Sequence, residues 1–236
     1  MRRFYSPPET FSDGSVTLSH EETRHLRDVL RLSENDRVRV FDGEGREFEA
    51  DIKNISKTST SLDVREQVEP ISPESPLHLT LASAMLKSDK FDLVVQKAVE
   101  LGVAHLIPLE TVRSELRPRD TMKKADRWRK IALEATKQCG RAKIMSVSEP
   151  VQFKKVSVVG NALFFTERAG FEFTSNTTPQ KITAFVGPEG GWDESELDVA
   201  RSNKYQLVTL GGRILRAETA AIVVTAILQH RFGDVN

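Results

Sequence analysis

From residue 77 onward, apolar runs of strand length alternate with segments of helix length, and this alternation constrains the fold more than any other feature. Strands are expected at 77–85, 103–109, 161–166, 182–186 and 205–210. Helices are expected after Ser88 or Asp89, over 121–141, after Asp193, which forms a capping box with Glu196 at the third position, and over 217–232. Strands that are separated by helices join through crossovers into a parallel sheet with helices on both faces. The sequence therefore predicts an α/β domain.

The first 75 residues follow a different pattern, typical of a small β-rich module. A Ser–Glu capping box and two alternating runs around a glycine turn predict one helix and a hairpin. The expected elements are a helix at 20–31, strands at 37–41 and 48–52, and a third strand at 61–68. Three prolines between Glu69 and Pro76 cannot continue a helix or a central strand, so a domain boundary is expected near residue 75.

The formal net charge of the chain is zero, so composition alone does not indicate binding to nucleic acid. The charges are unevenly distributed, however. Residues 1–76 carry 11 basic and 16 acidic side chains, whereas residues 111–143 carry 11 basic and 4 acidic ones. Two interpretations of the basic stretch stay open: a solvated helix face, or a surface that faces RNA.

Several classes of protein are disfavoured by what the sequence lacks. Cys139 is the single cysteine, so no internal disulfide forms and a reducing cytoplasm is expected. No apolar run has the length of a membrane span, and the first residues lack the apolar core of a signal peptide. The five histidines are not spaced with cysteines or acids as metal ligands are, so no metal site is expected.

Three expected strands end in segments that suit a ligand, because ligands of open parallel sheets bind beyond the carboxyl ends of the strands. These segments are 164–168, 185–191 and 210–220. The pair Gly211-Gly212 is by itself more often a tight turn. Charged side chains follow it closely and favour a binding site: Arg213, Arg216 and Glu218. The P-loop, the G-x-G-x-x-G motif and the G-x-S-x-G motif are absent, which leaves a ligand held mainly by backbone groups with basic side chains nearby.

Two of these segments resemble a known family. Gly187-Pro188-Glu189-Gly190-Gly191-Trp192 with Glu196, and the stretch LGGRILRAETA at 210–220, resemble the signature of the RsmE family, SPOUT-superfamily methyltransferases that modify small-subunit ribosomal RNA. Weaker blocks in the same order extend the resemblance over the whole chain, at Arg2-Arg3-Phe4, 25–31, 41–43, 90–114 and 138–141. Two positions depart from the family pattern. Asn35 stands where the family has a glycine, and asparagine also tolerates a left-handed turn. Lys137 stands where the family has a glutamate.

The resemblance implies a PUA-like RNA-binding β domain over 1–75 and a SPOUT methyltransferase domain over 76–236, whose part from about 160 to 236 is threaded as a trefoil knot, a rare topology. It also implies S-adenosylmethionine (SAM) as the cofactor, a homodimer, and 16S ribosomal RNA or the small ribosomal subunit as the partner. The implied product is N3-methyluridine. Two other functions stay open: a SPOUT ribose 2′-O-methyltransferase, and a non-catalytic RNA-binding protein of ribosome assembly.

The expected site residues fall into three groups. Those expected to bind the cofactor are Thr166, Glu167, Gly187, Gly190, Gly191, Leu210, Gly211, Arg213, Ile214, Leu215 and Ala217. For catalysis, we expect Arg216 to stabilise a uridinate, with Glu189 and Glu218 as candidate proton acceptors. Ion pairing of Arg216 with a glutamate, and support of the glycine loops by the glutamates, are the structural alternatives. The expected RNA contacts are Arg2, Arg3, Arg31, Arg113, Lys123, Lys124, Arg127, Lys137, Gln138 and Arg141.

Overall fold

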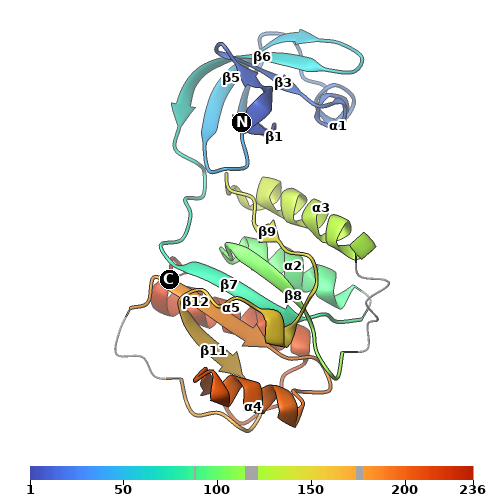
Figure 1. Ribbon diagram of the computed structural model, residues 1–236. Coiled ribbons are helices and arrows are strands. Elements are labelled where there is room, and N and C mark those ends of the chain that lie inside the picture. The colour runs from blue at the N-terminus through green and yellow to red at the C-terminus, as the bar shows by residue number, and fades with distance from the viewer. Residues whose placement is uncertain (88, 115–121, 174–177, 236) are drawn as a thin grey trace. The chain divides into compact units, whose positions relative to one another are not determined.

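The computed structural model describes residues 1–87, 89–114, 122–173 and 178–235 (Figure 1). The chain divides into two compact units. Unit 1 comprises Met1–Glu74 and Thr136–Ile144, and unit 2 comprises Ser75–Ala135 and Met145–Asn236.

Unit 1 is built on one six-stranded sheet in the order β1-β4-β5-β6-β3-β2. Its elements are β1 (Arg2–Tyr5), β2 (Phe11–Ser12), β3 (Ser15–Leu18), α1 (His20–Arg24), a π-helical turn (His25–Val29), β4 (Arg37–Phe41), β5 (Glu47–Ile55) and β6 (Thr60–Val68). The sheet is antiparallel except for β1, which pairs with β4 in parallel. The sequence predicted the hairpin β4–β5 and the strand β6, whereas β1 to β3 were not expected.

Alternation explains how unit 1 forms its core. Val38 and Val40 lie on the same face of β4 and are fully buried, together with Phe4 of β1 and Leu26 of the π-helical turn. The expected helix at 20–31 is divided: α1 ends at Arg24 and the chain continues as the π-helical turn. Asn35 adopts φ 72°, which confirms the left-handed turn expected at this position.

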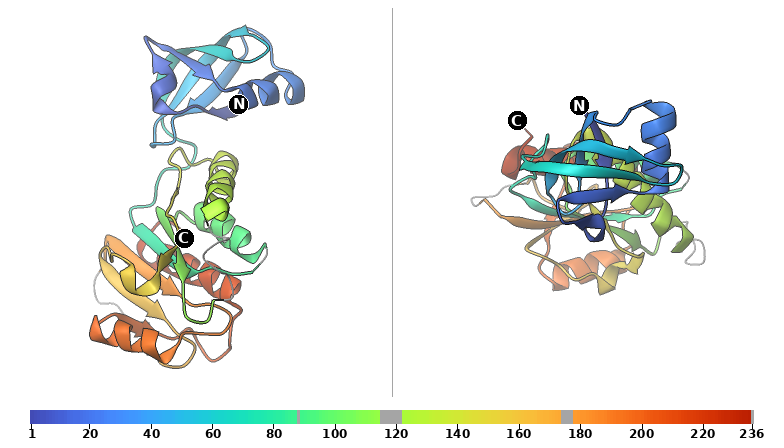
Figure 2. Two further views of the ribbon diagram at one scale, coloured as in Figure 1. Left: turned by 45° about the vertical axis from the view of Figure 1, so that its right-hand side comes forward. Right: turned by 90° about the horizontal axis from the view of Figure 1, so that it is seen from above.

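Unit 2 contains a parallel sheet in the order β10-β8-β7-β12-β11-β13, with β9 paired to β8 (Figure 2). Its strands are β7 (His78–Ala84), β8 (His105–Glu110), β9 (Ser146–Val147), β10 (Val151–Gln152), β11 (Asn161–Phe165), β12 (Lys181–Val186) and β13 (Gln206–Val208). Its helices are α2 (Lys90–Glu100), α3 (Met122–Cys139), α4 (Glu194–Ser202) and α5 (Ala217–Phe232). The last residues of α3 belong to unit 1. The predicted α/β class is confirmed.

Helices cover both faces of this sheet (Figure 1). On one face, α4 and the turn at Phe153 cover Phe164 of β11 and Phe185 of β12. On the other, α5 packs against α2 and contacts β7 and β12. Successive strand residues point to opposite faces, so strands covered on both sides need apolar residues at nearly every position, as β12 has from Ile182 to Val186.

The C-terminal helix α5 is held by a buried side chain. Gln229 donates a hydrogen bond of 3.0 Å to the carbonyl of Gly102, at the end of α2, and accepts one of 2.7 Å from the Ser75 hydroxyl. Among the described helices, none combines the length and the apolar character needed to span a membrane.

Candidate active site

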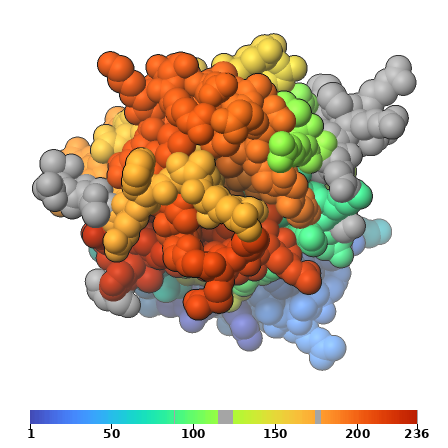
Figure 3. Space-filling view, turned by 90° about the horizontal axis from the view of Figure 1, so that it is seen from below, coloured from blue at the N-terminus to red at the C-terminus, as the bar shows by residue number. Residues whose placement is uncertain are grey.

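A cavity of about 560 Å³ lies in unit 2 at the carboxyl ends of the parallel strands. The segments after β11, β12 and β13 line it, and Lys90 and Arg113 join them from the segments after β7 and β8. Every residue expected to bind the cofactor lines this cavity, except Gly211. Arg216 and Glu189, which are expected to take part in catalysis, also line it. In Figure 3, which shows the molecule from below the view of Figure 1, a yellow-orange segment lies among the orange-red segments that follow it in the chain.

The segment after β12 is fixed by Trp192. Its indole Nε1 donates a hydrogen bond of 2.8 Å to the carbonyl of Phe165, and its ring lies 4.3 Å from that of Phe164. A Cβ at Gly187 would lie 2.9 Å from the indole nitrogen, so only glycine fits there. Trp192 therefore ties the segment after β12 to the end of β11.

The helix start after this segment has the expected capping box. Asp193 caps α4, and the Glu196 carboxylate accepts from the Asp193 amide at 3.0 Å. Hydrogen bonds from Ser195 lower the pKa of the Asp193 carboxyl, and Arg113 adds to this effect. Arg113 also donates to the carbonyl of Gly190 at 3.1 Å, so this side chain, expected at RNA, supports the cavity wall.

The segment after β13 leaves its backbone uncommitted. Gly211 has φ 62°, and a Cβ at Gly211 or Gly212 would meet nothing within 4 Å. No backbone amide from Leu210 to Leu215 donates a hydrogen bond to another described residue. A backbone that faces open space and retains its donors is suited to hold a polar ligand.

Lys90 joins two glutamates from different segments. Its Nζ lies 3.4 Å from Glu189 Oε1 and 3.8 Å from Glu218 Oε2. Glu218 Oε2 is buried, and no hydrogen bond to a described residue reaches it. The sequence places Lys90 only in a weaker block of the family resemblance, because its two partners lie about a hundred or more residues away.

Three arginines form the exposed cationic rim of the cavity: Arg168, Arg213 and Arg216. None of their side chains makes a hydrogen bond or an ion pair with another residue in the part of the chain that the structure describes. The structural alternative for Arg216, an ion pair with Glu189 or Glu218, is thus not formed; Lys90 takes that place. These guanidinium groups are available to a ligand.

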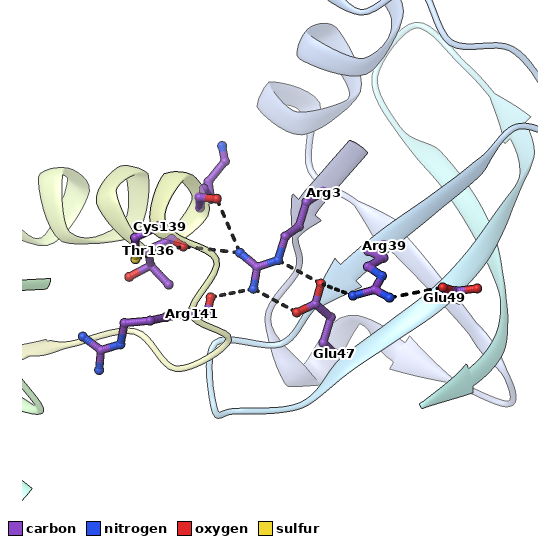
Figure 4. Close-up of polar contacts among 8 residues, drawn as sticks. Arg3, Arg39, Glu47, Glu49, Thr136, Cys139 and Arg141 are labelled. Atoms are coloured by element: carbon purple, nitrogen blue, oxygen red, sulfur yellow. Dashed lines mark hydrogen bonds and ion pairs between the residues drawn. The ribbon is translucent and has the colours of Figure 1, made fainter. Parts of the chain in front are cut away.

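Most cations expected at RNA are already paired. Figure 4 shows Arg3 between the Glu47 carboxylate and carbonyl groups at the end of α3. Arg3 is 7% exposed and Arg141, held by Glu74 at 2.6 Å, is 3% exposed. Lys137 pairs with Glu22 at 2.6 Å. These three side chains stabilise unit 1 rather than present charge to solvent.

The other expected RNA residues are more accessible. Arg127 is exposed but pairs with Asp92, which also accepts from the Trp128 indole. Lys124 is half-buried on α3, and the side chain of Lys123 lies outside the described part. The remaining three are exposed: Arg2, Arg31 and Gln138. Among the described residues, no three side chains of His, Cys, Asp or Glu lie together as a metal-binding group.

Two family models match the chain. The RNA methyltransferase domain matches residues 73–229, and the RNA methyltransferase PUA domain matches residues 18–64. The chain is 34% identical to ribosomal RNA small subunit methyltransferase E of Rickettsia conorii, over 97% of this chain and 94% of the relative. It is 33% identical to the protein of that name from Synechocystis, over 95% of this chain and 76% of the relative.

Solved structures agree with these matches. The ribosomal RNA small subunit methyltransferase E of Neisseria gonorrhoeae, bound to SAM, superposes with a TM-score of 0.90 at 31% identity over 100% of both chains. A protein of Legionella pneumophila described as a methyltransferase, with SAM bound, superposes with a TM-score of 0.88 at 30% identity over 98% of both chains.

Proposed function

Because this chain belongs to the ribosomal RNA small subunit methyltransferase E family, we propose that it transfers the methyl group of SAM to N3 of a uridine in 16S ribosomal RNA. The observation that carries the proposal is the cavity at the ends of the parallel strands, where an uncommitted glycine backbone meets unpaired arginines and a lysine–glutamate cluster. The enzyme is a SAM-dependent ribosomal RNA methyltransferase. The uridine N3 specificity is the finer part of the proposal.

The cavity suits SAM in size and in chemistry. Ligand pockets measure about 300–1,000 Å³, and this cavity lies within that range. Apolar residues suited to the adenine and ribose carbons line part of it, including Leu210, Leu215 and Val224. The open space beside Gly212 is not explained by φ or by packing within the chain, and a ligand approaching the backbone accounts for it. When bound, SAM supplies an electrophilic methyl group on a sulfonium and leaves as a thioether.

The reaction requires loss of the proton on uracil N3, which stays bound at neutral pH. Arg216, unpaired at the rim, donates hydrogen bonds to the uracil oxygens as negative charge develops there. Glu218 accepts the N3 proton through a water, since its buried Oε2 has no hydrogen bond among the described residues and Glu218 does not line the cavity itself. Lys90 holds the two glutamates in place.

We also propose the remaining features of the family for this chain. These are a PUA-like domain over 1–75, a methyltransferase domain over 76–236 with a trefoil knot from about 160 onward, and a homodimer in the cytoplasm. The composition of α5 supports the proposal of a homodimer, because apolar residues occupy its half-exposed positions as well as its buried ones. The half-exposed apolar residues are Ile222, Val223, Ala226 and Ile227.

Mass spectrometry of 16S RNA nucleosides from cells that lack this protein tests the proposed function. We expect N3-methyluridine to be absent, and to return when the wild-type gene is restored. Loss of a 2′-O-methylnucleoside instead would assign the ribose reaction, and an unchanged nucleoside profile would favour a non-catalytic role. Purified protein incubated with SAM and unmodified small-subunit RNA provides the direct measurement.

A further inference from the structure

Phe171 is the most exposed large apolar side chain in the described part of the chain, with 82% of its surface accessible. It follows the segment Thr166–Ala169, which lines the cavity. The ring is therefore close in sequence to the proposed methyl-transfer site but does not line the cavity. Single exposed apolar side chains are common on protein surfaces, so the hold on the Phe171 backbone and the charges around it decide whether the ring has a role.

The backbone that carries this ring is firmly held. The Phe171 amide donates to the carbonyl of Leu207 at 3.1 Å, and the Thr209 amide donates to the Phe171 carbonyl at 3.0 Å. The residue thus extends the sheet beside the edge strand β13, bridging Val208 in parallel. The Phe171 ring is presented to solvent from a fixed backbone rather than from a mobile loop.

The neighbouring residue is fitted to the same position. A Cβ at Gly170 would lie 2.5 Å from the carbonyl carbon of Val208, so no larger residue allows this close approach. The Gly170 amide donates to the Thr209 hydroxyl at 3.1 Å, and the Ala169 amide donates to the Thr166 hydroxyl at 3.0 Å. The segment that leads to Phe171 is therefore anchored at Ala169, at Gly170 and at Phe171 itself.

The charges close to this segment favour a polyanion. Arg168 precedes Phe171 by three residues, and Arg213 follows β13; both are exposed, line the cavity and are unpaired among the described residues. Phosphate groups bind such guanidinium groups, while unpaired bases stack on exposed aromatic rings. An exposed ring on an anchored backbone, with exposed arginines on the adjoining segments, suits single-stranded RNA.

We propose that Phe171 is the stacking platform for an unpaired base that flanks the target uridine, with Arg168 and Arg213 binding the adjoining phosphates. This inference rests on the proposed function and makes it more specific: the substrate presents its target in an unstacked, single-stranded segment. Contact of the Phe171 ring with a second copy of this chain is the competing outcome, and the test separates RNA binding from self-association.

Photocrosslinking locates the contact without depending on methyl transfer. The probe is a short single-stranded oligouridylate carrying one 5-iodouridine, irradiated with the full-length protein and mapped by peptide mass spectrometry. We expect the adduct at Phe171, because the iodinated base reacts with an aromatic ring on which it stacks. Adducts only at other residues would overturn the proposal.

Steady-state kinetics on unmodified small-subunit RNA give the second readout. Loss of one base–aromatic stack predicts a rise in KM for RNA of about 5- to 150-fold in Phe171→Ala, with retained SAM affinity and recovery in Phe171→Trp. Val159→Ala, which shortens an exposed apolar side chain just before β11, is the matched control and leaves KM unchanged.

An unchanged KM in Phe171→Ala, or loss of self-association with RNA affinity intact, overturns the proposal. If the wild-type protein transfers no methyl group, the proposed function fails, whereas the crosslink still decides the stacking contact.

Discussion

The indole of Trp192 and the carbonyl of Phe165 are joined by a hydrogen bond of 2.8 Å that links two walls of the cavity. Phe165 is the last residue of β11, and Trp192 follows the glycine segment after β12. Because both residues line the cavity, a change in this bond alters the site as well as the stability of unit 2.

Replacing Trp192 by phenylalanine is expected to weaken both folding and cofactor binding. The aromatic packing on Phe164 is retained in part, but the carbonyl of Phe165 loses its buried donor, which costs about 1–3 kcal/mol. Urea denaturation and calorimetric titration with SAM measure the two effects. Trp128→Phe is the matched control: it removes a comparable indole hydrogen bond, to Asp92 at 3.1 Å, outside the cavity. Equal SAM affinity in both variants would contradict the prediction.

Arg216→Ala is expected to lower turnover by about 100-fold or more while SAM affinity is retained, because one charge-stabilising donor contributes about that much. Single-turnover methylation of unmodified small-subunit RNA measures the rate, and titration with SAM measures the affinity. Arg213→Ala, a change of the same kind on the same rim, is expected to act on RNA binding instead. Near-normal turnover in Arg216→Ala would remove this side chain from the chemistry.

The affinity for RNA is expected to fall with salt, and the rim arginines are expected to carry much of this dependence. Arg213→Ala should lower the slope of log K against log salt by about one, since one phosphate contact is lost. Arg201→Ala is the control, because Arg201 is exposed on α4 but is paired with Glu194 at 2.7 Å. Filter binding across a salt series gives the slopes. Equal slopes for wild type and Arg213→Ala would show that this side chain does not contact phosphate.

Much of the fold follows from the sequence, because strand and helix patterns are local. The strand ends, the capping box at Asp193 and the boundaries of α5 were predicted in this way. Ion pairs between distant residues were not predictable, since a basic stretch shows charge but not its partners. Lys137 pairs with Glu22 across 115 positions, and Arg141 pairs with Glu74 across 67. For the same reason, the sequence favoured α3 as the RNA-facing surface, whereas the unpaired arginines lie at the cavity rim.

Arg3→Met is expected to destabilise unit 1 by about 3–5 kcal/mol, because it leaves the fully buried Glu47 carboxylate without its main partner. Hydrogen exchange of β1 and β4 amides in the full-length protein measures the loss. Arg37→Met is the control: its pair with Asp51 is longer, at 3.7 Å, and partly exposed, so a much smaller loss of stability is expected. Unaltered hydrogen exchange in Arg3→Met, together with weaker RNA binding, would instead show that Arg3 contacts RNA.

Acid is expected to destabilise unit 2 through His105. Burial lowers the pKa of this imidazole, His78 adds to the effect, and Nε2 lies 2.6 Å from the Ser148 hydroxyl. Below about pH 6.5 the unfolded chain binds a proton that the folded chain excludes, so the free energy of unfolding falls as pH drops from there toward the lowered pKa of the folded state. Hydrogen exchange of β8 at neutral and at mildly acidic pH measures this change.

We expect the loss of unfolding free energy in acid to be smaller in His105→Gln. His230→Gln, at an exposed position on α5, is expected to behave as the wild type. The same acid response in His105→Gln and in the wild type would assign the effect to another group.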